Sequence, residues 1–169
     1  MLRIERFIKK HRNIVHGRKA LNKQLPPKYR RPTFDWDLFS KHPKKDADKL
    51  QEYMDKFVGW DRFYMESKPI TGRKDKLYRV VDRLTGGEVA DFMKTPRAKN
   101  LYVVISGIRY ETLERAKRVY KKILSDPKYQ HRWAKARYDL QTIEEFEREL
   151  KKGKVNKNKI PSVFKLIEI

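Results

Sequence analysis

The sequence has 169 residues, of which 43 are Lys or Arg and 22 are Asp or Glu, so its formal net charge at pH 7 is +21. It holds no cysteine, which excludes disulfide scaffolds, thiolate zinc sites and cysteine nucleophiles. The length fits one core with arms, and no apolar run approaches the ~20 residues of a membrane span. The charge predicts a polyanionic partner, and we favour nucleic acid over an anionic membrane surface.

Residues 1–45 are predicted to form a basic arm. Residues 1–31 contain eleven basic side chains and a single acid, Glu5. Apolar residues at helical spacing, from Ile4 to Val15, predict a short amphipathic helix, and the prolines of 26–32 predict an extended segment. A basic amphipathic amino terminus is also typical of an organellar targeting segment.

An aromatic-rich helix is predicted over residues 46–66. The side chains that recur on one face are Leu50, Tyr53, Met54, Phe57 and Tyr64. Aromatic residues interleaved with lysines can serve as a base-stacking platform in proteins that bind single strands. At helical spacing they more often pack in a core, and we favour that interpretation.

The central segment, 77–124, changes to the alternation typical of strands. Strands are predicted at 77–84, 89–93 and 101–105, with a hairpin turn at Thr85-Gly86-Gly87 and a helix at 112–124. The expected fold class is therefore α+β. A small three-stranded antiparallel sheet would pack on a helix and be flanked by additional helices and extended basic arms.

Two helices are predicted over 126–150, followed by a lysine-rich tail at 151–169. The first helix begins with Asp126-Pro127, and the second begins at Thr142, where Thr142 and Glu145 fit a capping box. The tail carries several lysines and ends in an apolar stretch.

The order of these central pieces resembles the Apetala-two type DNA-binding domain of plant ethylene-response factors and apicomplexan regulators. The matching pieces are Tyr78-Arg79-Val80-Val81, Gly86-Gly87-Glu88-Val89-Ala90-Asp91-Phe92, Asn100-Leu101-Tyr102-Val103 and Tyr110-Glu111-Thr112 with Ala116 and Tyr120. The resemblance implies a sheet that enters the major groove of DNA.

Departures from that family's pattern weaken the expected base reading. Glu88 and Tyr102 replace tryptophans of the family, and Asp82 replaces an arginine. The resemblance therefore implies a retained scaffold that holds phosphates through charge, with the residues Arg79, Arg83, Lys94, Arg97 and Lys99.

No catalytic constellation is apparent in the sequence. The four histidines are scattered without the spacing of metal ligands. Asp35 and Asp37 suggest a divalent metal, but no third acid follows at a recognisable spacing. The sequence therefore predicts no catalytic residue, no metal, no cofactor, no small-molecule substrate and no enzyme.

The distributed charge favours a structural RNA-binding protein of a ribonucleoprotein. We expect a ribosomal protein that contacts rRNA and neighbouring proteins, in a mitochondrial or other organellar matrix, with cytoplasm or nucleus as the alternative. The alternative function is a DNA-binding transcription regulator or recombination accessory protein. The predicted nucleic-acid contacts are Arg3, Arg6, Lys9, Lys10, Arg12, Arg18, Lys19, Arg30, Arg31, Arg79, Arg83, Lys94, Arg97, Lys99, Arg132, Lys135, Arg137, Lys151, Lys152 and Lys154.

Overall fold

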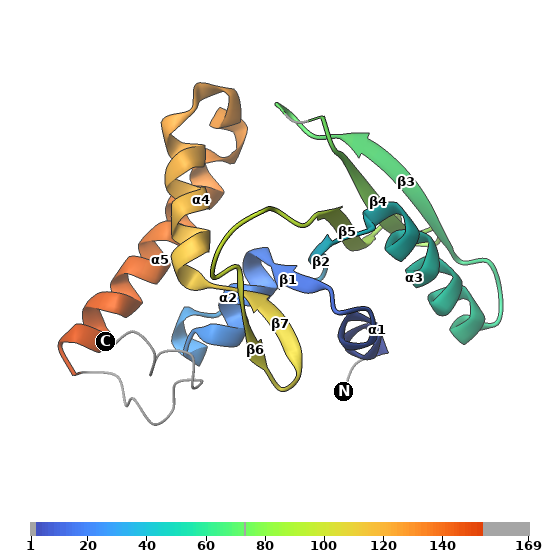
Figure 1. The fold of residues 1–169 in the computed structure, drawn as a ribbon, viewed down its shortest axis with the longest axis horizontal. Coiled ribbons are helices and arrows are strands. Elements are labelled where there is room, and N and C mark those ends of the chain that lie inside the picture. The colour runs from blue at the N-terminus through green and yellow to red at the C-terminus, as the bar shows by residue number, and fades with distance from the viewer. Residues whose placement is uncertain (1–2, 73, 154–169) are drawn as a thin grey trace.

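The fold is built on a seven-stranded mixed sheet with helices on both of its faces (Figure 1). It comes from a computed structural model that describes residues 3–72 and 74–153. The elements of the amino-terminal part are α1 (Arg3–His11), β1 (Ile14–His16), α2 (Gly17–Gln24), the 3-10 turn η1 (Pro27–Tyr29) and β2 (Trp36–Ser40). They are followed by α3 (Pro43–Val58), β3 (Phe63–Pro69), β4 (Lys76–Asp82), β5 (Glu88–Lys94), β6 (Tyr102–Ile105) and β7 (Ile108–Glu111). The carboxy-terminal elements are α4 (Leu113–Ser125), η2 (Pro127–Arg132) and α5 (Trp133–Lys151).

The sheet interleaves distant parts of the chain. Its strand order is β3-β4-β5-β2-β1-β7-β6, so the short strands β1 and β2 lie in its middle. The pairs β2–β5 and β1–β7 are parallel, whereas the other neighbours are antiparallel. The centre of the sheet is therefore completed only by long-range pairing.

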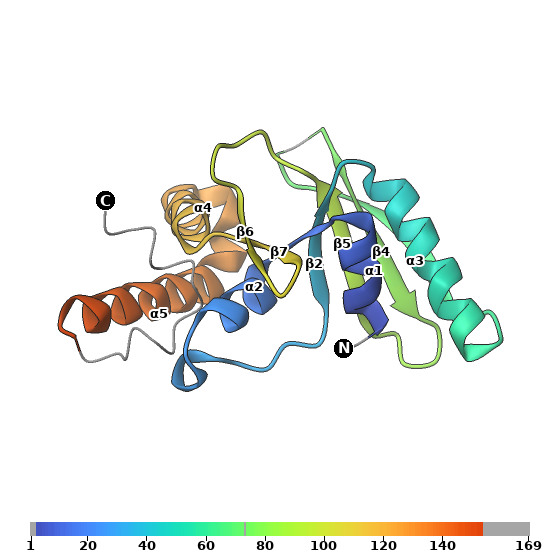
Figure 2. The same cartoon turned by 60° about the horizontal axis from the view of Figure 1, so that its bottom comes forward.

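One face of the sheet is apolar and packs against α1 and α3. Alternation along the strands places Leu38 of β2, Val80 of β4 and Phe92 of β5 on this face, and all three are fully buried. Helix α1 contributes Phe7 and Ile8 to the same core. Figure 2 shows α1 and α3 beside the strands of this half of the sheet.

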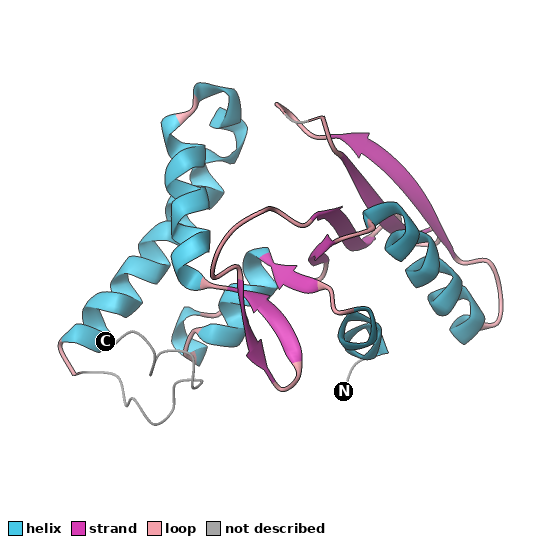
Figure 3. Ribbon diagram, viewed as in Figure 1, coloured by secondary structure: helices cyan, strands magenta, loops and turns pink. Residues whose placement is uncertain are grey.

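A second apolar cluster holds the carboxy-terminal helices together. Helices α4 and α5 pack around Ile123, Ile143 and Phe146, and α2 adds Leu21. Helix α4 begins at the cap residue Thr112, whose hydroxyl accepts a hydrogen bond from the Arg115 amide. Figure 3 shows the two helices as a pair that projects beside the sheet.

The predicted three-stranded antiparallel sheet is wrong. The hairpin of β4 and β5 forms as expected, but β6 pairs with β7 and not with β5. Strand β5 pairs instead with β2, a segment expected to belong to an arm. The α+β class stands, but the sheet on which the Apetala-two resemblance depended is absent from the described residues.

Other boundaries also differ from the predictions. The expected arm at 1–45 contains β1 and β2 of the central sheet, because buried apolar residues such as Val15 and Leu38 recur within it. The helix predicted over 46–66 ends at Val58, where Gly59 adopts a positive φ of 80°, and β3 follows. No break occurs at Thr142, whose hydroxyl donates to the Tyr138 carbonyl inside α5. The predicted tail lies outside the described residues from Lys154 onward, and no described helix is long and apolar enough to cross a membrane.

Candidate functional site

A row of polar residues crosses five strands on the face of the sheet opposite the α1–α3 core. The row runs from Glu66 on β3 through Arg79 on β4, Asp91 on β5 and Asp37 on β2 to His16 on β1. Each is the direct cross-strand partner of the next, so their side chains project from the same face. We call Asp35, Asp37 and Asp91 the acidic cluster, since Asp35 lies two residues before Asp37.

The surroundings of Asp37 oppose its ionisation. Burial raises its pKa from 3.8 to about 6, and the negative charges of Asp35 and then Asp91 add to this effect. Lys135 and Arg132 oppose the rise because they lie near enough to stabilise the charged carboxylate. Asp35 itself accepts a hydrogen bond from the Thr33 hydroxyl at 2.9 Å. The cluster therefore concentrates negative charge that this face only partly neutralises.

Asp91 is held by an arginine. The guanidinium of Arg79 donates to both carboxylate oxygens, with Nε–Oδ1 at 2.7 Å and Nη2–Oδ2 at 2.8 Å. Arg79 also contacts Glu88, and the hydrogen bonds to Asp91 raise the arginine's pKa. Asp91 is 8% exposed, so this bidentate pair compensates an almost fully buried charge.

Gly17 brings the start of α2 against Asp37. Its φ is 64°, a conformation that glycine adopts most readily, and a Cβ at this position would overlap Oδ2 of Asp37. Its backbone N–H donates to the carboxylate of Glu111 on β7. Burial raises the pKa of Glu111 to about 7, and Arg115, 3.0 Å away, opposes that rise.

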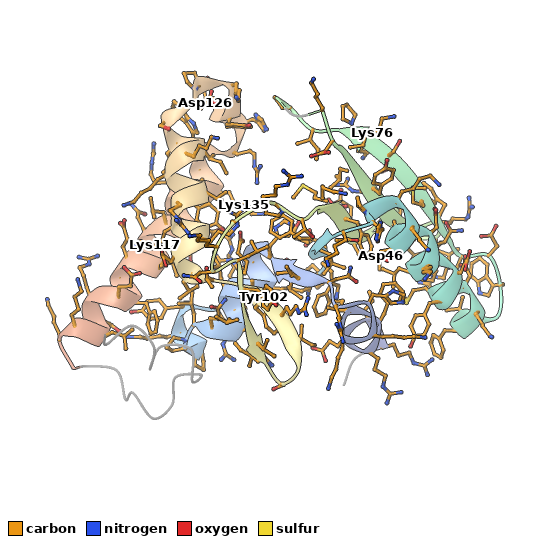
Figure 4. All side chains as sticks on the ribbon, viewed as in Figure 1. Asp46, Lys76, Tyr102, Lys117, Asp126 and Lys135 are labelled. Atoms are coloured by element: carbon orange, nitrogen blue, oxygen red, sulfur yellow. The ribbon has the colours of Figure 1, made fainter. Side chains whose placement is uncertain are left out.

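Cations surround the acidic cluster. Lys135, at the start of α5, lies between the carboxy-terminal helices and the sheet in Figure 4, and its charge reaches Asp37 together with that of Arg132. Lys19 of α2 donates to the Thr33 carbonyl at 2.9 Å and lies over the Trp36 ring. Burial lowers the pKa of Lys19, whereas Asp35 and Asp37 raise it. The site therefore pairs acids on the sheet with cations on α2, η2 and α5.

The donor set suits a divalent cation. Within residues 3–72 and 74–153, no three His, Asp or Glu side chains are arranged closely enough to hold a metal ion as they stand. Asp35 lies just before the start of β2, two residues from Asp37, and the repulsion between the two carboxylates contributes to the raised pKa of Asp37. Carboxylate oxygens are the ligands that Mg²⁺ prefers, and a cation would relieve this repulsion. Asp35 and Asp37 are therefore two candidate ligands, and Asp91 could join them only after Arg79 releases it.

The structure distributes the predicted nucleic-acid contacts over several surfaces. Lys19, Arg132 and Lys135 meet at the acidic cluster, whereas Arg79 is occupied by Asp91 and Glu88. Arg18 is only 2% exposed and pairs with Asp139, so a phosphate cannot reach it in this arrangement.

The other predicted contacts lie away from the acidic cluster, and several of them contact carbonyl or carboxylate oxygens of the protein itself. Arg30 donates to the Leu25 carbonyl, Arg31 lies 3.4 Å from Asp139, Arg83 lies 3.6 Å from Asp61, and Lys94 donates to the Lys41 carbonyl. Exposed positions hold Arg3, Arg6, Lys9, Lys10, Arg12, Arg97, Lys99, Arg137, Lys151 and Lys152. Lys154 lies outside the described residues.

Sequence reasoning missed Asp91 and Gly17, and it set aside the pair Asp35 and Asp37. A signal for Asp91 was present, because a carboxylate interrupts the otherwise apolar run Val89-Ala90-Asp91-Phe92-Met93. A charged residue inside a buried strand requires a partner or a function.

Comparison with known proteins identifies a shared fold. No family model matches the sequence, and no curated protein matches it. Among solved structures, the polyadenylate synthase of Megavirus superposes with a TM-score of 0.68 at 20% sequence identity. The match covers 85% of this chain and 30% of the synthase chain. At this identity the similarity shows the fold alone, and this chain spans less than a third of that enzyme's length.

Proposed function

We propose that this chain is a metal-dependent nucleotidyltransferase domain that joins a nucleotide to the end of a polynucleotide. The observation that carries the proposal is the acidic cluster, in which Asp37 and Asp91 pair across the parallel strands β2 and β5 and the charge of Asp35 acts on Asp37. The solved structure that shares the fold is named a polyadenylate synthase, and polyadenylate is a polynucleotide. This proposal replaces the expectation of a non-enzyme, against which the shared fold also argues.

The proposed reaction attaches a hydroxyl oxygen of the acceptor strand to the α-phosphorus of a nucleoside triphosphate. The bond between the α-phosphorus and the oxygen that links it to the β-phosphate breaks, the acceptor hydroxyl loses its proton, and pyrophosphate leaves. A divalent cation held by Asp35 and Asp37 would supply charge neutralisation at the reacting phosphate. The chain's own residues provide the remaining electrostatics.

Those residues are the acids of the acidic cluster and the cations that lie near it. Asp37, with a pKa of about 6, is mostly ionised at neutral pH and can act as a ligand there. Lys135 and Arg132, whose charges lower the pKa of Asp37, would hold the phosphates that become pyrophosphate. Because Gly17 carries no Cβ, the first turn of α2 can lie directly against Asp37.

The test is primer extension by the purified full chain. A labelled short RNA is incubated with each of the four nucleoside triphosphates and Mg²⁺ or Mn²⁺, and the products are separated on a denaturing gel. Extension should occur in the wild type and in Asp48→Asn, an exposed control on α3, and should be lost in Asp35→Asn/Asp37→Asn. Absence of extension with every triphosphate and both metals, in a folded protein, would overturn the proposal.

A structural role in a ribonucleoprotein is the second candidate, and the spread of exposed cations over α1, the β5–β6 loop and α5 favours it. Sedimentation of the native protein in a sucrose gradient, with and without ribonuclease, tests it. Co-migration with a ribosomal particle would support it, whereas slow sedimentation under both conditions would refute it. The organellar location stays a prediction that this experiment also addresses. We do not carry the DNA-regulator alternative forward, because the three-stranded sheet that it would place in the major groove does not form: β6 pairs with β7 and β5 pairs with β2.

A further inference from the structure

Helices α1 and α3 lie against each other on the side of the sheet opposite the acidic cluster. Three contacts repeat along them in opposite order: His11 faces Asp46 at 3.6 Å, the rings of Phe7 and Tyr53 lie 5.9 Å apart, and Arg3 lies over the Phe57 ring. Both helices bury their inner faces in the core beneath the sheet. Their junction therefore forms a continuous surface, which we call the α1–α3 seam.

Aromatic side chains are exposed along this seam. Tyr53 is 37% exposed, Phe57 is 48% exposed, and Trp60, just after the end of α3, is 48% exposed. Tyr53 and Phe57 are four residues apart and share one face of the helix. Tyr53 has a ring contact with Phe7 and Phe57 has one with Arg3, and a large part of both side chains is still exposed to solvent.

Exposed basic side chains lie along both helices of the seam. Arg3, Arg6 and Lys10 form an exposed stripe at i, i+3 and i+7 on α1, and Lys49 and Lys56 flank Tyr53 on α3. Within the described part of the chain, none of these five forms an ion pair with a carboxylate.

Few acids oppose this positive charge. Glu52 is an exposed acid beside the α3 stripe, Asp61 follows Trp60 and lies 3.6 Å from Arg83, and Glu5 lies on the other side of α1. His11 faces Asp46, Lys49 and Lys10, and burial lowers its pKa, so it adds little charge at neutral pH. The seam is therefore a strongly positive surface that carries stacking groups.

We propose that the α1–α3 seam binds single-stranded RNA. Exposed rings between cations provide stacking for unpaired bases and charge for the phosphates, whereas a duplex keeps its bases stacked internally and offers only phosphates. Charge complementarity selects a polyanion, and the exposed rings select one with free bases. The seam lies on the face away from Asp37, so it would hold a part of the strand remote from the acidic cluster. The inference does not depend on catalysis by the chain.

The test measures binding of fluorescent single-stranded and duplex RNA of equal length by anisotropy over a series of salt concentrations. It uses the full chain carrying Asp35→Asn/Asp37→Asn, so that neither metal binding nor turnover affects the signal. In this background, Tyr53→Ala/Phe57→Ala should weaken single-strand binding by about fivefold or more and leave the dependence on salt unchanged. Its effect on duplex binding should be small.

Removal of charge should give a different signature. Arg6→Glu/Lys10→Glu should weaken binding of both RNAs and lower the slope of log affinity against log salt, on the single strand by roughly 0.7 for each phosphate that the variant no longer neutralises. The control, Lys121→Glu/Lys122→Glu on the exposed side of α4, where Lys121 lies 3.9 Å from Glu144, should have a clearly smaller effect.

Two results would overturn the proposal. Single-strand affinity that is unchanged in Tyr53→Ala/Phe57→Ala would assign the exposed rings to a protein partner. Equal losses of affinity in the seam and control charge variants would show that RNA binds by overall charge alone. The side chains substituted on α1, α3 and α4 are exposed, and far-UV circular dichroism with thermal unfolding verifies that each variant, including the Asp35→Asn/Asp37→Asn background, is folded.

Discussion

Replacement of Asp37 by Asn is expected to stabilise the fold at neutral pH while it removes the proposed activity. The pKa of Asp37 is about 6 in the folded protein against 3.8 for an unperturbed side chain. The folded state therefore binds this proton more tightly than the unfolded state, and its stability falls as the pH rises from about 4 to about 6. A shift of about two pKa units corresponds to ~3 kcal/mol, all of it expressed above pH 6. Asn carries no charge at any pH and avoids this loss.

The assay is urea unfolding of both proteins at pH 4 and pH 7.5 without divalent cations. We expect Asp37→Asn to be up to ~3 kcal/mol more stable than the wild type at the higher pH and nearly equal to it at the lower pH. Glu111, whose pKa is about 7, titrates in both proteins, so most of its contribution cancels. The control, Asp48→Asn, removes a surface pair with Lys44 at 3.1 Å and should change stability by less than ~0.5 kcal/mol.

Divalent cations provide a second readout of the same reasoning. Mg²⁺ should raise the unfolding midpoint of the wild type at pH 7.5, because a ligand bound only by the folded state stabilises it, and should leave Asp37→Asn nearly unchanged. The reasoning is refuted if Asp37→Asn is less stable than the wild type at pH 7.5, or if the difference between the proteins is the same at both pH values.

Three further substitutions test the packing around the site. Gly17→Ala should destabilise the fold by ~1–2 kcal/mol and reduce extension, because the new methyl group meets Asp37 at a positive φ; an unchanged urea midpoint would contradict this. Arg18→Met should cost ~3–5 kcal/mol by leaving Asp139 buried without its main partner, and a second change, Asp139→Leu, should restore most of the stability in the same assay. Phe92→Ala should cost ~3–5 kcal/mol, measured by thermal unfolding, because its ring has no exposed surface; a loss below ~1 kcal/mol would show that the core refills the space.

Local signals located many of the elements. The β4–β5 hairpin follows from alternating apolar residues around Thr85-Gly86-Gly87, and α4 follows from its cap at Thr112. Long-range pairing left no comparable signal. Strand β1 has three residues, too few for a period to be visible, and its position in the sheet depends on β2 and β7. The segment that contains it was therefore interpreted as an arm from its charge.

The acidic cluster was missed for the same physical reason. Asp35 and Asp37 are recognisable as a pair, but their third member, Asp91, reaches them only because β2 and β5 pair in parallel. A parallel pair requires a long crossover, so its residues are distant in the sequence. The buried pair of Arg18 and Asp139 was not predicted either, because the two residues are distant in the sequence and Arg18 was interpreted as one of many surface cations.

The central position of β1 and β2 has a consequence for how the chain can fold during its synthesis. Their outer neighbours are β5, which ends at Lys94, and β7, which ends at Glu111. The strand β2 has no parallel partner until the ribosome has released the chain through Lys94, and β1 has none until it has released the chain through Glu111. Unpaired strand edges are where nascent chains pair wrongly with one another, and pairing between distant segments is slow. The strands β1 and β2 are therefore synthesised before the strands that complete their pairing. During that interval the high positive charge keeps neighbouring copies of the chain apart.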